Sequence, residues 1–288
     1  MKMNYQSYKA NGIKFSLVGD DLYCTIDQCG VKAMYPLPQT NFQGTADFVL
    51  MDLDGTTVKS EGFWIWLIEK TAKRLLKNDS FAFSEEDIPF VSGFSTMEHF
   101  DYCLKKYQIQ SNLLQANAIY HEIAEYELNE IMQGRGNTSA FEARAGLKEF
   151  LYELKNRGVK IGLVTSGLDY KAIPEIVSVF RNLNMGNPLD FYDAIITGGK
   201  RKQKGQYGTI GEMAVKPHPW VYAEIAMGLG VFDKSKVVVL EDSAAGLISA
   251  KLAGFDVIGF NDGNITASGM AEQTYKMVDS FEEALKFI

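Results

Sequence analysis

The chain has 288 residues, of which 46% are hydrophobic and 12% aromatic, and it can bury a sizeable core in one large domain or two smaller ones. Its net charge of -7 argues against a general nucleic-acid binder, but a locally positive site for phosphorylated small molecules remains compatible with it. Three cysteines without zinc-ligand spacing, the lack of a signal-peptide core and the lack of an apolar run of about 18 residues predict a reduced, cytoplasmic protein that binds no membrane.

The first part of the chain, residues 1–45, differs in pattern from the rest. Segments 13–18 and 22–26 alternate roughly between apolar and polar side chains and are joined through Gly19. This pattern predicts a β-hairpin. A linker into the main body is then indicated by three residues that break regular structure, Pro36, Pro38 and Gly44.

The apolar run 48–51 predicts a buried strand, and two carboxylates follow it directly. In a continuing strand Asp52 and Asp54 would point to opposite faces. A turn at Gly55 can instead bring both to the C-terminal end of the strand, the usual position of the ligand crevice in open α/β sheets. Two carboxylates there are costly unless a cation or substrate chemistry uses them.

Residues 62–137 show helical patterning throughout. Apolar side chains recur at helical spacing over 63–75, 95–107 and 111–132, and a glycine-rich stretch ends the last segment. We therefore predict an all-helical block between the first strand and the next one.

From about residue 143, predicted helices and strands alternate. Strands are predicted over 160–165, 194–197, 236–240 and 256–260. Helices are predicted before, between and after them, one ending at Gly158 and the others over 170–182, 218–229, 244–253 and 281–288. This rhythm predicts an α/β fold with a parallel sheet and right-handed crossovers.

Polar side chains follow the strands, and a parallel sheet would project them all from one edge. They are Asp52, Asp54, Thr165, Ser166, Glu241 and Asp242, with Lys216 reached through the loop after the third strand. Carboxylates are the oxygen ligands that Mg²⁺ prefers. A hydroxyl group and a lysine can bind phosphoryl oxygens, and a carboxylate can be the nucleophile that forms an aspartyl-phosphate.

Four ordered stretches resemble the motifs of the haloacid dehalogenase (HAD) superfamily. They are Asp52-Leu53-Asp54-Gly55-Thr56, Leu163-Val164-Thr165-Ser166, Lys216-Pro217-His218-Pro219 and Glu241-Asp242-Ser243-Ala244-Ala245-Gly246. The likeness covers about 48 to 262, and the helical block stands where that family has its α-helical (C1-type) cap. Four motifs in order are specific, whereas one alone is weak.

The resemblance implies a role for each motif residue. Asp52 would attack the substrate phosphorus and ligate Mg²⁺, and Asp54 would be the general acid and then the base, with its backbone carbonyl on the metal. Thr165 and Ser166 would bind the phosphoryl group, and Lys216 would pair with Asp52 and the phosphate. Asp242 would complete the metal ligands, and Glu241 would ligate directly or support through water.

We therefore expect a Rossmann-like parallel sheet core with an inserted helical cap and an N-terminal β-hairpin extension. The domains would be an extension (1–45), a catalytic core (46–61 and 138–288) and a cap (62–137). The function would be that of a Mg²⁺-dependent phosphatase of the phosphatase/phosphohexomutase-like branch. Its partner would be a small phosphorylated metabolite such as a sugar phosphate, and not a nucleic acid.

Two alternatives remain open from the sequence. A phosphomutase similar to β-phosphoglucomutase would transfer the phosphoryl group to a second hydroxyl group. However, that branch would have a His at Trp64 and an Arg near Thr96, which puts this activity in doubt. The second alternative is a non-catalytic phospholigand-binding protein, which four intact motifs disfavour.

Two further features bear on the substrate. Trp64 and Trp66 face different sides at helical spacing, so at most one can reach the site, and core packing is the favoured interpretation. The loop 198–208 carries four positive charges, which favours a solvated loop. An alternative hypothesis is that this loop recruits a substrate with extra negative charge.

Overall fold

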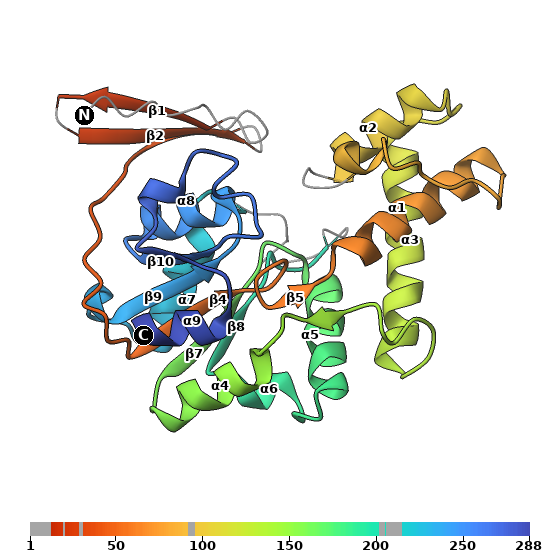
Figure 1. Cartoon of the computed structure of the whole chain (residues 1–288). Helices are drawn as coiled ribbons and strands as arrows, with labels where there is room; N and C mark the ends of the chain where they lie inside the picture. Colours follow the sequence, from red (N-terminus) through yellow and green to blue (C-terminus); the bar gives the residue numbers. More distant parts are fainter. Residues whose placement is uncertain (1–12, 20, 29–30, 92–95, 202–204, 206–214) are drawn as a thin grey trace.

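A six-stranded parallel sheet forms the centre of the molecule (Figure 1). The computed structural model describes residues 13–19, 21–28, 31–91, 96–201, 205 and 215–288. The strand order is β11-β10-β9-β4-β7-β8, and every neighbouring pair is parallel. The strands are β4 (Phe48–Asp52), β7 (Lys160–Val164), β8 (Ala194–Ile196), β9 (Val237–Glu241), β10 (Asp256–Phe260) and β11 (Lys276–Val278). The predicted α/β fold is confirmed, and β11 is an additional edge strand.

Helices cover both faces of this sheet. Alternate residues of β4 point to opposite sides, so that Val49 and Met51 join one apolar core and Leu50 the other. The first core is closed by α4 (Leu147–Asn156), α5 (Asp169–Asn182) and α9 (Phe281–Ala284), and the second by α7 (Trp220–Leu229) and α8 (Ala244–Ala253). The remaining helical elements of this part of the chain are short, namely α6 (Pro188–Phe191), η3 (Lys234–Lys236), η4 (Ala271–Gln273) and η5 (Leu285–Phe287). The predicted closing helix is therefore a short α-helix followed by a 3-10 turn.

The helical block lies between two short strands that pair with each other. β5 (Val58–Lys59) leads into the block and β6 (Glu142–Ala143) leads out of it, in antiparallel register. Between them lie α1 (Glu61–Leu76), η2 (Ile88–Phe90), α2 (Thr96–Lys106) and α3 (Leu113–Met132). α3 packs against α1 and α2 and also against α5 of the core. The chain therefore leaves and re-enters the core at one place.

The N-terminal part forms a separate antiparallel sheet of β1 (Ile13–Val18), β2 (Asp21–Gln28) and β3 (Val31–Pro36). The predicted hairpin is confirmed. β3 was not predicted, and Pro36, which was assigned to the linker, is its last residue. Pro36 is tolerated because it ends an edge strand, where a missing N–H breaks no ladder.

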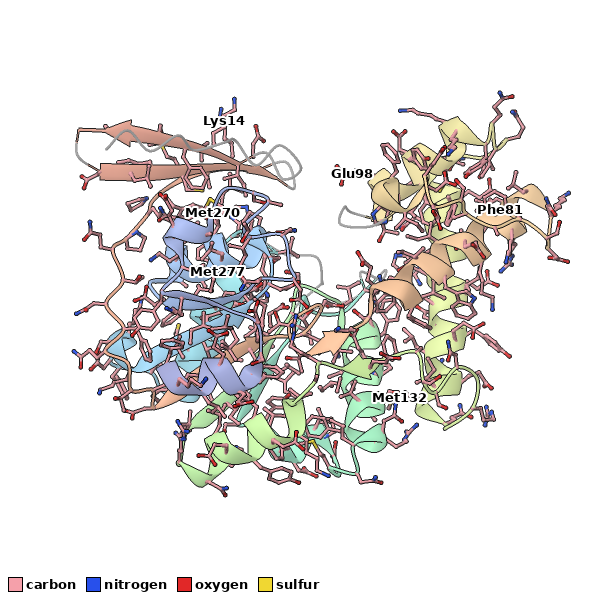
Figure 2. The ribbon with its side chains drawn as sticks, in the orientation of Figure 1. Lys14, Phe81, Glu98, Met132, Met270 and Met277 are labelled. Atoms are coloured by element: carbon pink, nitrogen blue, oxygen red, sulfur yellow. The ribbon has the colours of Figure 1, made fainter. Side chains whose placement is uncertain are left out.

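One face of this N-terminal sheet covers α7 and α8, and its opposite face is exposed, with Lys14 pointing outward (Figure 2). Cys24 and Ile26 join the second apolar core. The segment that follows is held by Asp256, which accepts hydrogen bonds from the Thr40 hydroxyl group and from the Phe42 backbone N–H (2.7 Å). Within the described residues, no helix has both the length and the apolar character to cross a membrane.

Candidate active site

The turn after β4 directs two carboxylates to the same side. Asp52 is the last residue of the strand, and Gly55 adopts a φ of 86° that disfavours a side chain. A Cβ atom on Gly55 would lie 2.2 Å from the Asp242 Oδ2 atom. Glycine is therefore required both by the backbone conformation and by the close approach of the Asp242 carboxylate.

Three carboxylates and one ammonium group meet at this edge of the sheet. Asp52, Glu241 and Asp242 each offer an oxygen atom, and these atoms lie within 4.8 Å of one another. The Lys216 Nζ atom donates to Asp52 Oδ1 (2.5 Å) and to Glu241 Oε1 (2.6 Å). Asp52 is 6% exposed and Glu241 is fully buried. The cluster thus places three acidic groups around one buried cation.

Burial and mutual repulsion disfavour the charged forms of these acids. Burial first, and the neighbouring Glu241 second, raise the pKa of Asp52 well above its usual range. The same two causes raise the pKa of Asp242 to about 7. Burial opposes the charge of Lys216, but Asp52 and Glu241 together raise its pKa above the usual value. A further cation bound here would relieve the excess of negative charge, so the donor set fits a hard divalent metal ion.

Glu241 is held by hydrogen bonds on both of its oxygen atoms. Oε1 accepts from Lys216 and from the Tyr222 hydroxyl group (2.7 Å), and Oε2 accepts from the Ser243 hydroxyl group (3.0 Å). Gly246 of α8 leaves room for this carboxylate, because a Cβ atom there would lie 1.8 Å from Oε1. Glu241 therefore fixes the position of the lysine.

Gly246→Ala is expected to lower both the melting temperature and the phosphate release that the resemblance implies. Alanine is the better helix former by about 1 kcal/mol, so helix propensity alone would raise the stability. The added methyl group instead displaces the Glu241 carboxylate and loosens Lys216. Differential scanning fluorimetry and a phosphate-release assay measure the two effects. Gly228→Ala in α7, where the new Cβ atom meets nothing within 4 Å, is the matched control. Equal behaviour of the two variants would contradict the role given to Gly246.

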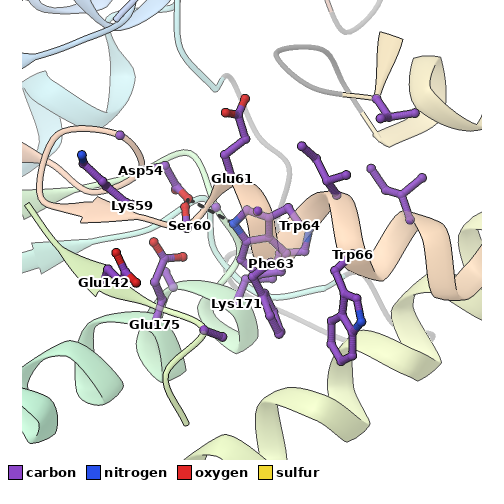
Figure 3. A pocket seen from close by; sticks show the side chains of 18 of the residues that line it. Asp54, Lys59, Ser60, Glu61, Phe63, Trp64, Trp66, Glu142, Lys171 and Glu175 are labelled. Carbon is purple, nitrogen blue, oxygen red and sulfur yellow. Dashed lines mark hydrogen bonds between the residues drawn. The ribbon is translucent and has the colours of Figure 1, made fainter. Parts of the chain in front are cut away.

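Asp54 faces the helical block. Its Oδ1 atom accepts from the Ser60 hydroxyl group (2.7 Å) and from the Trp64 indole N–H (3.3 Å), and its Oδ2 atom accepts from Thr165 (3.3 Å). Figure 3 shows Trp64 turned toward Asp54, whereas Trp66 points away from it. Trp64 packs against the apolar core, as the favoured interpretation expects, and its N–H also reaches the site, so it is the one tryptophan of the two that does.

The remaining predicted residues lie at the same edge. The Thr165 hydroxyl oxygen accepts from the Gly167 backbone N–H (2.8 Å), and the Ser166 hydroxyl oxygen accepts from the Lys216 backbone N–H (3.1 Å). The Asp242 carboxylate accepts from Thr56 (3.2 Å). All seven residues singled out from the sequence are thus brought together from four segments of the chain, at or just after the ends of strands or, for Lys216, before α7.

Arg144 at the end of the helical block is a site residue that the sequence did not reveal. Its guanidinium group donates to the carbonyl groups of Thr56 (2.9 Å) and Gly55 (2.6 Å) and to both Asp262 oxygen atoms (2.8 and 3.0 Å). The group also lies 4.1 Å from the centroid of the Phe260 ring. Arg144 therefore fixes the turn next to Asp54, through partners 88 to 118 residues away that no local pattern indicates.

Glu175 is a second residue near the site that the sequence did not reveal. It is 1% exposed, and its Oε1 atom has no hydrogen-bond partner among the described residues. Burial first, and Asp54 second, raise its pKa well above the usual range. A charged residue on the apolar face of α5, between Ala172 and Val179, was the signal that could have indicated it.

A cavity of about 1200 Å³ opens between the core and the helical block. Core residues that line it include Asp54, Asp242 and Lys171, and residues of the block include Trp64 and Tyr120. Figure 3 labels Asp54, Lys171 and Trp64 among them. A small phosphorylated molecule would be enclosed by both parts.

Among its described residues, the basic loop contacts the helical block through Arg201. Arg201 pairs with Glu125 of α3 at 2.8 Å, so its charge is partly neutralised. Lys200 is exposed. Lys202 and Lys204, which also carried the recruitment hypothesis, lie outside the described residues.

The family model of haloacid dehalogenase-like hydrolases matches residues 49–260. The chain is 23% identical over 220 residues to the "Phosphorylated carbohydrates phosphatase" of Thermotoga maritima. The aligned region covers 75% of this chain and 87% of that protein.

Solved structures share the fold. CbbY from Rhodobacter sphaeroides, in complex with xylulose-(1,5)bisphosphate, has a TM-score of 0.57 at 20% identity, covering 83% of this chain and 96% of that one. A predicted phosphoglycolate phosphatase from Haemophilus somnus has a TM-score of 0.60 at 17% identity, covering 84% and 97%. The family model spans most of the chain and includes all seven site residues singled out from the sequence. The chain therefore belongs to the haloacid dehalogenase-like hydrolase family, in which its helical block is the cap.

Proposed function

We propose that the chain is a metal-dependent phosphatase that hydrolyses a small phosphomonoester through an aspartyl-phosphate on Asp52. The observation that carries this proposal is the buried contact of Asp52 with Lys216 beside Asp242, at the sheet edge that opens toward the cap. The curated relative, named a phosphatase, supports the reaction class. We take 46–61 and 138–288 as the catalytic core, 62–137 as the cap and 1–45 as an extension.

In the first half-reaction, an Asp52 oxygen atom attacks the phosphorus and the bond to the leaving oxygen breaks. Lys216 holds the Asp52 carboxylate and binds the phosphoryl oxygens. Thr165 and Ser166 donate hydrogen bonds to the same oxygens. Asp54 gives its proton to the leaving oxygen, so that the product departs as a neutral alcohol.

In the second half-reaction, Asp54 takes a proton from water as the water oxygen attacks the phosphorus. The bond between Asp52 and phosphorus breaks, and inorganic phosphate and the Asp52 carboxylate are regenerated. Ser60 and Trp64 hold the Asp54 carboxylate in place through both steps. The cap excludes bulk water while the leaving group departs.

The cofactor that fits the acidic cluster is Mg²⁺. Asp52 and Asp242 would hold it with their carboxylates and Asp54 with its backbone carbonyl, while Glu241 supports the site through Lys216. When bound, the ion supplies positive charge that offsets the negative charge of the phosphoryl oxygens.

Millimolar Mg²⁺ is expected to raise the melting temperature, and Asp242→Asn to remove most of that increase. A ligand that binds only the folded state at 100 times its Kd stabilises by about 2.7 kcal/mol. Differential scanning fluorimetry with and without Mg²⁺ measures the shift independently of turnover. Asp47→Asn, an exposed residue just before β4, is the control that keeps the shift. A full shift in the Asp242→Asn variant would show that the metal binds elsewhere.

The substrate class we propose is a phosphorylated carbohydrate or a compound of similar size. The relative from Thermotoga maritima is named for such substrates. The flat ring of Trp64 at the cavity wall is suited to a sugar face.

A phosphate-release screen over phosphorylated metabolites, with Asp52→Asn as the blank, tests the proposal. Release from a sugar phosphate supports it, whereas an isomeric sugar phosphate without free phosphate would establish the phosphomutase alternative. No release from any compound, together with unchanged behaviour of the Asp52→Asn variant, would favour the non-catalytic alternative.

A further inference from the structure

The N-terminal sheet lies outside the part of the chain that the family model matches, yet it reaches the segment that carries Lys216. The model matches residues 49–260, whereas β1–β3 lie within 13–36. This sheet lies over α8 in Figure 1. Tyr35 of β3 is the cross-strand partner of Cys24 of β2, so both side chains point to the face that covers the second apolar core.

The side chain of Tyr35 contacts His218, two residues after Lys216. The Tyr35 hydroxyl group and the His218 Nδ1 atom form a hydrogen bond of 3.2 Å, and the two rings meet edge to face with centroids 6.0 Å apart. His218 is 4% exposed, and burial lowers its pKa, so the imidazole is neutral at pH 7. A buried imidazole requires a hydrogen-bond partner, and the N-terminal sheet supplies one.

The backbone of His218 is also held by hydrogen bonds. Its carbonyl group accepts from the Ser249 hydroxyl group of α8 (2.5 Å), and its N–H donates to the carbonyl group of Val215 (3.0 Å). Residues 215–219 form neither a helix nor a strand, so no regular ladder of hydrogen bonds fixes them. The position of this segment therefore depends on individual contacts, of which the one with Tyr35 holds the imidazole ring.

The same segment carries the ammonium group at the sheet edge. The Lys216 backbone N–H donates to the Ser166 hydroxyl group (3.1 Å), and its Nζ atom donates to Asp52 (2.5 Å) and Glu241 (2.6 Å). Lys216 and His218 are separated by two peptide units, at most about 7 Å of extended chain. A displacement of His218 is therefore passed on to Lys216 over a short distance. A misplacement of about 1 Å in an active site can lower the rate about 100-fold.

We propose that Tyr35 is a positioning residue, which acts through His218 to hold Lys216 at the phosphoryl side of the site. The N-terminal sheet is then part of the scaffold of the active site, since a strand places a side chain more precisely than an irregular segment does. The inference rests on the proposed phosphatase function for the role of Lys216. Because Lys216 meets the phosphoryl group that all substrates share, loss of the contact affects all of them by the same factor.

The Tyr35→Phe variant tests this proposal, because it keeps the ring in the apolar core and removes only the hydroxyl group. The value of kcat/KM is expected to fall ~10-fold, and by the same factor for glycerol 3-phosphate and glucose 6-phosphate. Tyr23→Phe is the matched control. Tyr23 precedes Cys24 in β2 and points to the opposite face of the sheet, so its variant should keep the wild-type kcat/KM.

A double-mutant cycle shows whether Tyr35 acts through His218. His218→Asn places an amide group near the former Nδ1 position and should retain most of the activity, whereas His218→Leu should lower kcat/KM as Tyr35→Phe does. In the His218→Leu background, Tyr35→Phe should have no further effect, because the contact is already lost. All variants are compared at a temperature at which fluorimetry shows them folded. Independent losses that multiply, or a lower melting temperature with unchanged kcat/KM, would make Tyr35 a packing residue and refute the proposal.

Binding of inorganic phosphate in the presence of Mg²⁺ gives a readout that needs no turnover. Calorimetry should show a Kd about 10-fold higher for Tyr35→Phe than for the wild-type protein, and an unchanged Kd for Tyr23→Phe. If no substrate releases phosphate but this difference in Kd is found, the phosphatase is refuted and the positioning role stands. If phosphate is released and Tyr35→Phe changes neither kcat/KM nor Kd, the positioning role is refuted and the phosphatase stands.

Discussion

Asp52→Asn is expected to abolish phosphate release without destabilising the fold. The amide cannot form the phosphoenzyme, so kcat should fall at least ~10³-fold. The same change removes one of three crowded carboxylates around Lys216, and Lys216 keeps Glu241 as its partner. The melting temperature should therefore equal or exceed that of the wild-type protein, as is common where a site is arranged for activity at the expense of stability. A phosphate-release assay and differential scanning fluorimetry measure the two quantities.

Asp47→Asn makes the same chemical change near the opposite end of β4 and should affect neither quantity. If the Asp52→Asn variant kept more than a few per cent of the activity, another group would have to be the nucleophile. If its melting temperature dropped by several degrees, the carboxylate crowding inferred from the raised pKa values would be wrong.

Lys216→Met should produce the largest combined loss of stability and activity. The ammonium is buried with Asp52 and Glu241, so its removal leaves two buried carboxylates without their cation. Breaking a buried ion pair from one side costs about 3–5 kcal/mol. Activity should fall as well, because the phosphoryl oxygens lose their fixed positive charge. Urea denaturation gives the free energy of unfolding, and phosphate release gives kcat.

The double variant Lys216→Met, Glu241→Gln separates the two effects. Removing one negative charge together with the positive one should restore much of the stability, whereas activity should stay low because the lysine is still missing. Recovery of activity in the double variant would mean that Lys216 serves only to balance Glu241.

Much of the site could be predicted because its residues follow strands. β4, β7 and β9 are apolar runs, and parallel strands bring their C-terminal ends to one edge, so Asp52, Thr165 and Asp242 could be grouped without coordinates. Lys216 was added to this group because Lys216-Pro217-His218-Pro219 resembles the third of the four motifs. The same logic gives the sheet, whose strand boundaries agree with the predicted ones within a residue or two.

Side chains from the cap escaped prediction for a physical reason. Trp64 and Tyr120 sit on amphipathic helices, where helical spacing does not distinguish a residue that lines a cavity from one that packs in the core. Arg144 directly follows β6, and its partners Thr56 and Asp262 lie far away in the sequence, so no local pattern indicates its role. The third strand of the N-terminal sheet ends in a proline, Pro36, which indicated a linker. Proline is compatible with an edge strand, but the edge position is known only once the sheet is known.

The way the N-terminal sheet is attached affects how the protein is made on the ribosome. The contact of Phe42 with Asp256 spans 214 residues, and the helices under β1–β3 belong to the last quarter of the chain. At about 5–20 residues per second, the first strands wait roughly 10–40 s of translation before their docking surface exists. During that time the apolar face with Cys24 and Ile26 is exposed. The N-terminal sheet is thus synthesised well before it can dock, and its apolar face stays unprotected until α7 and α8 have been made.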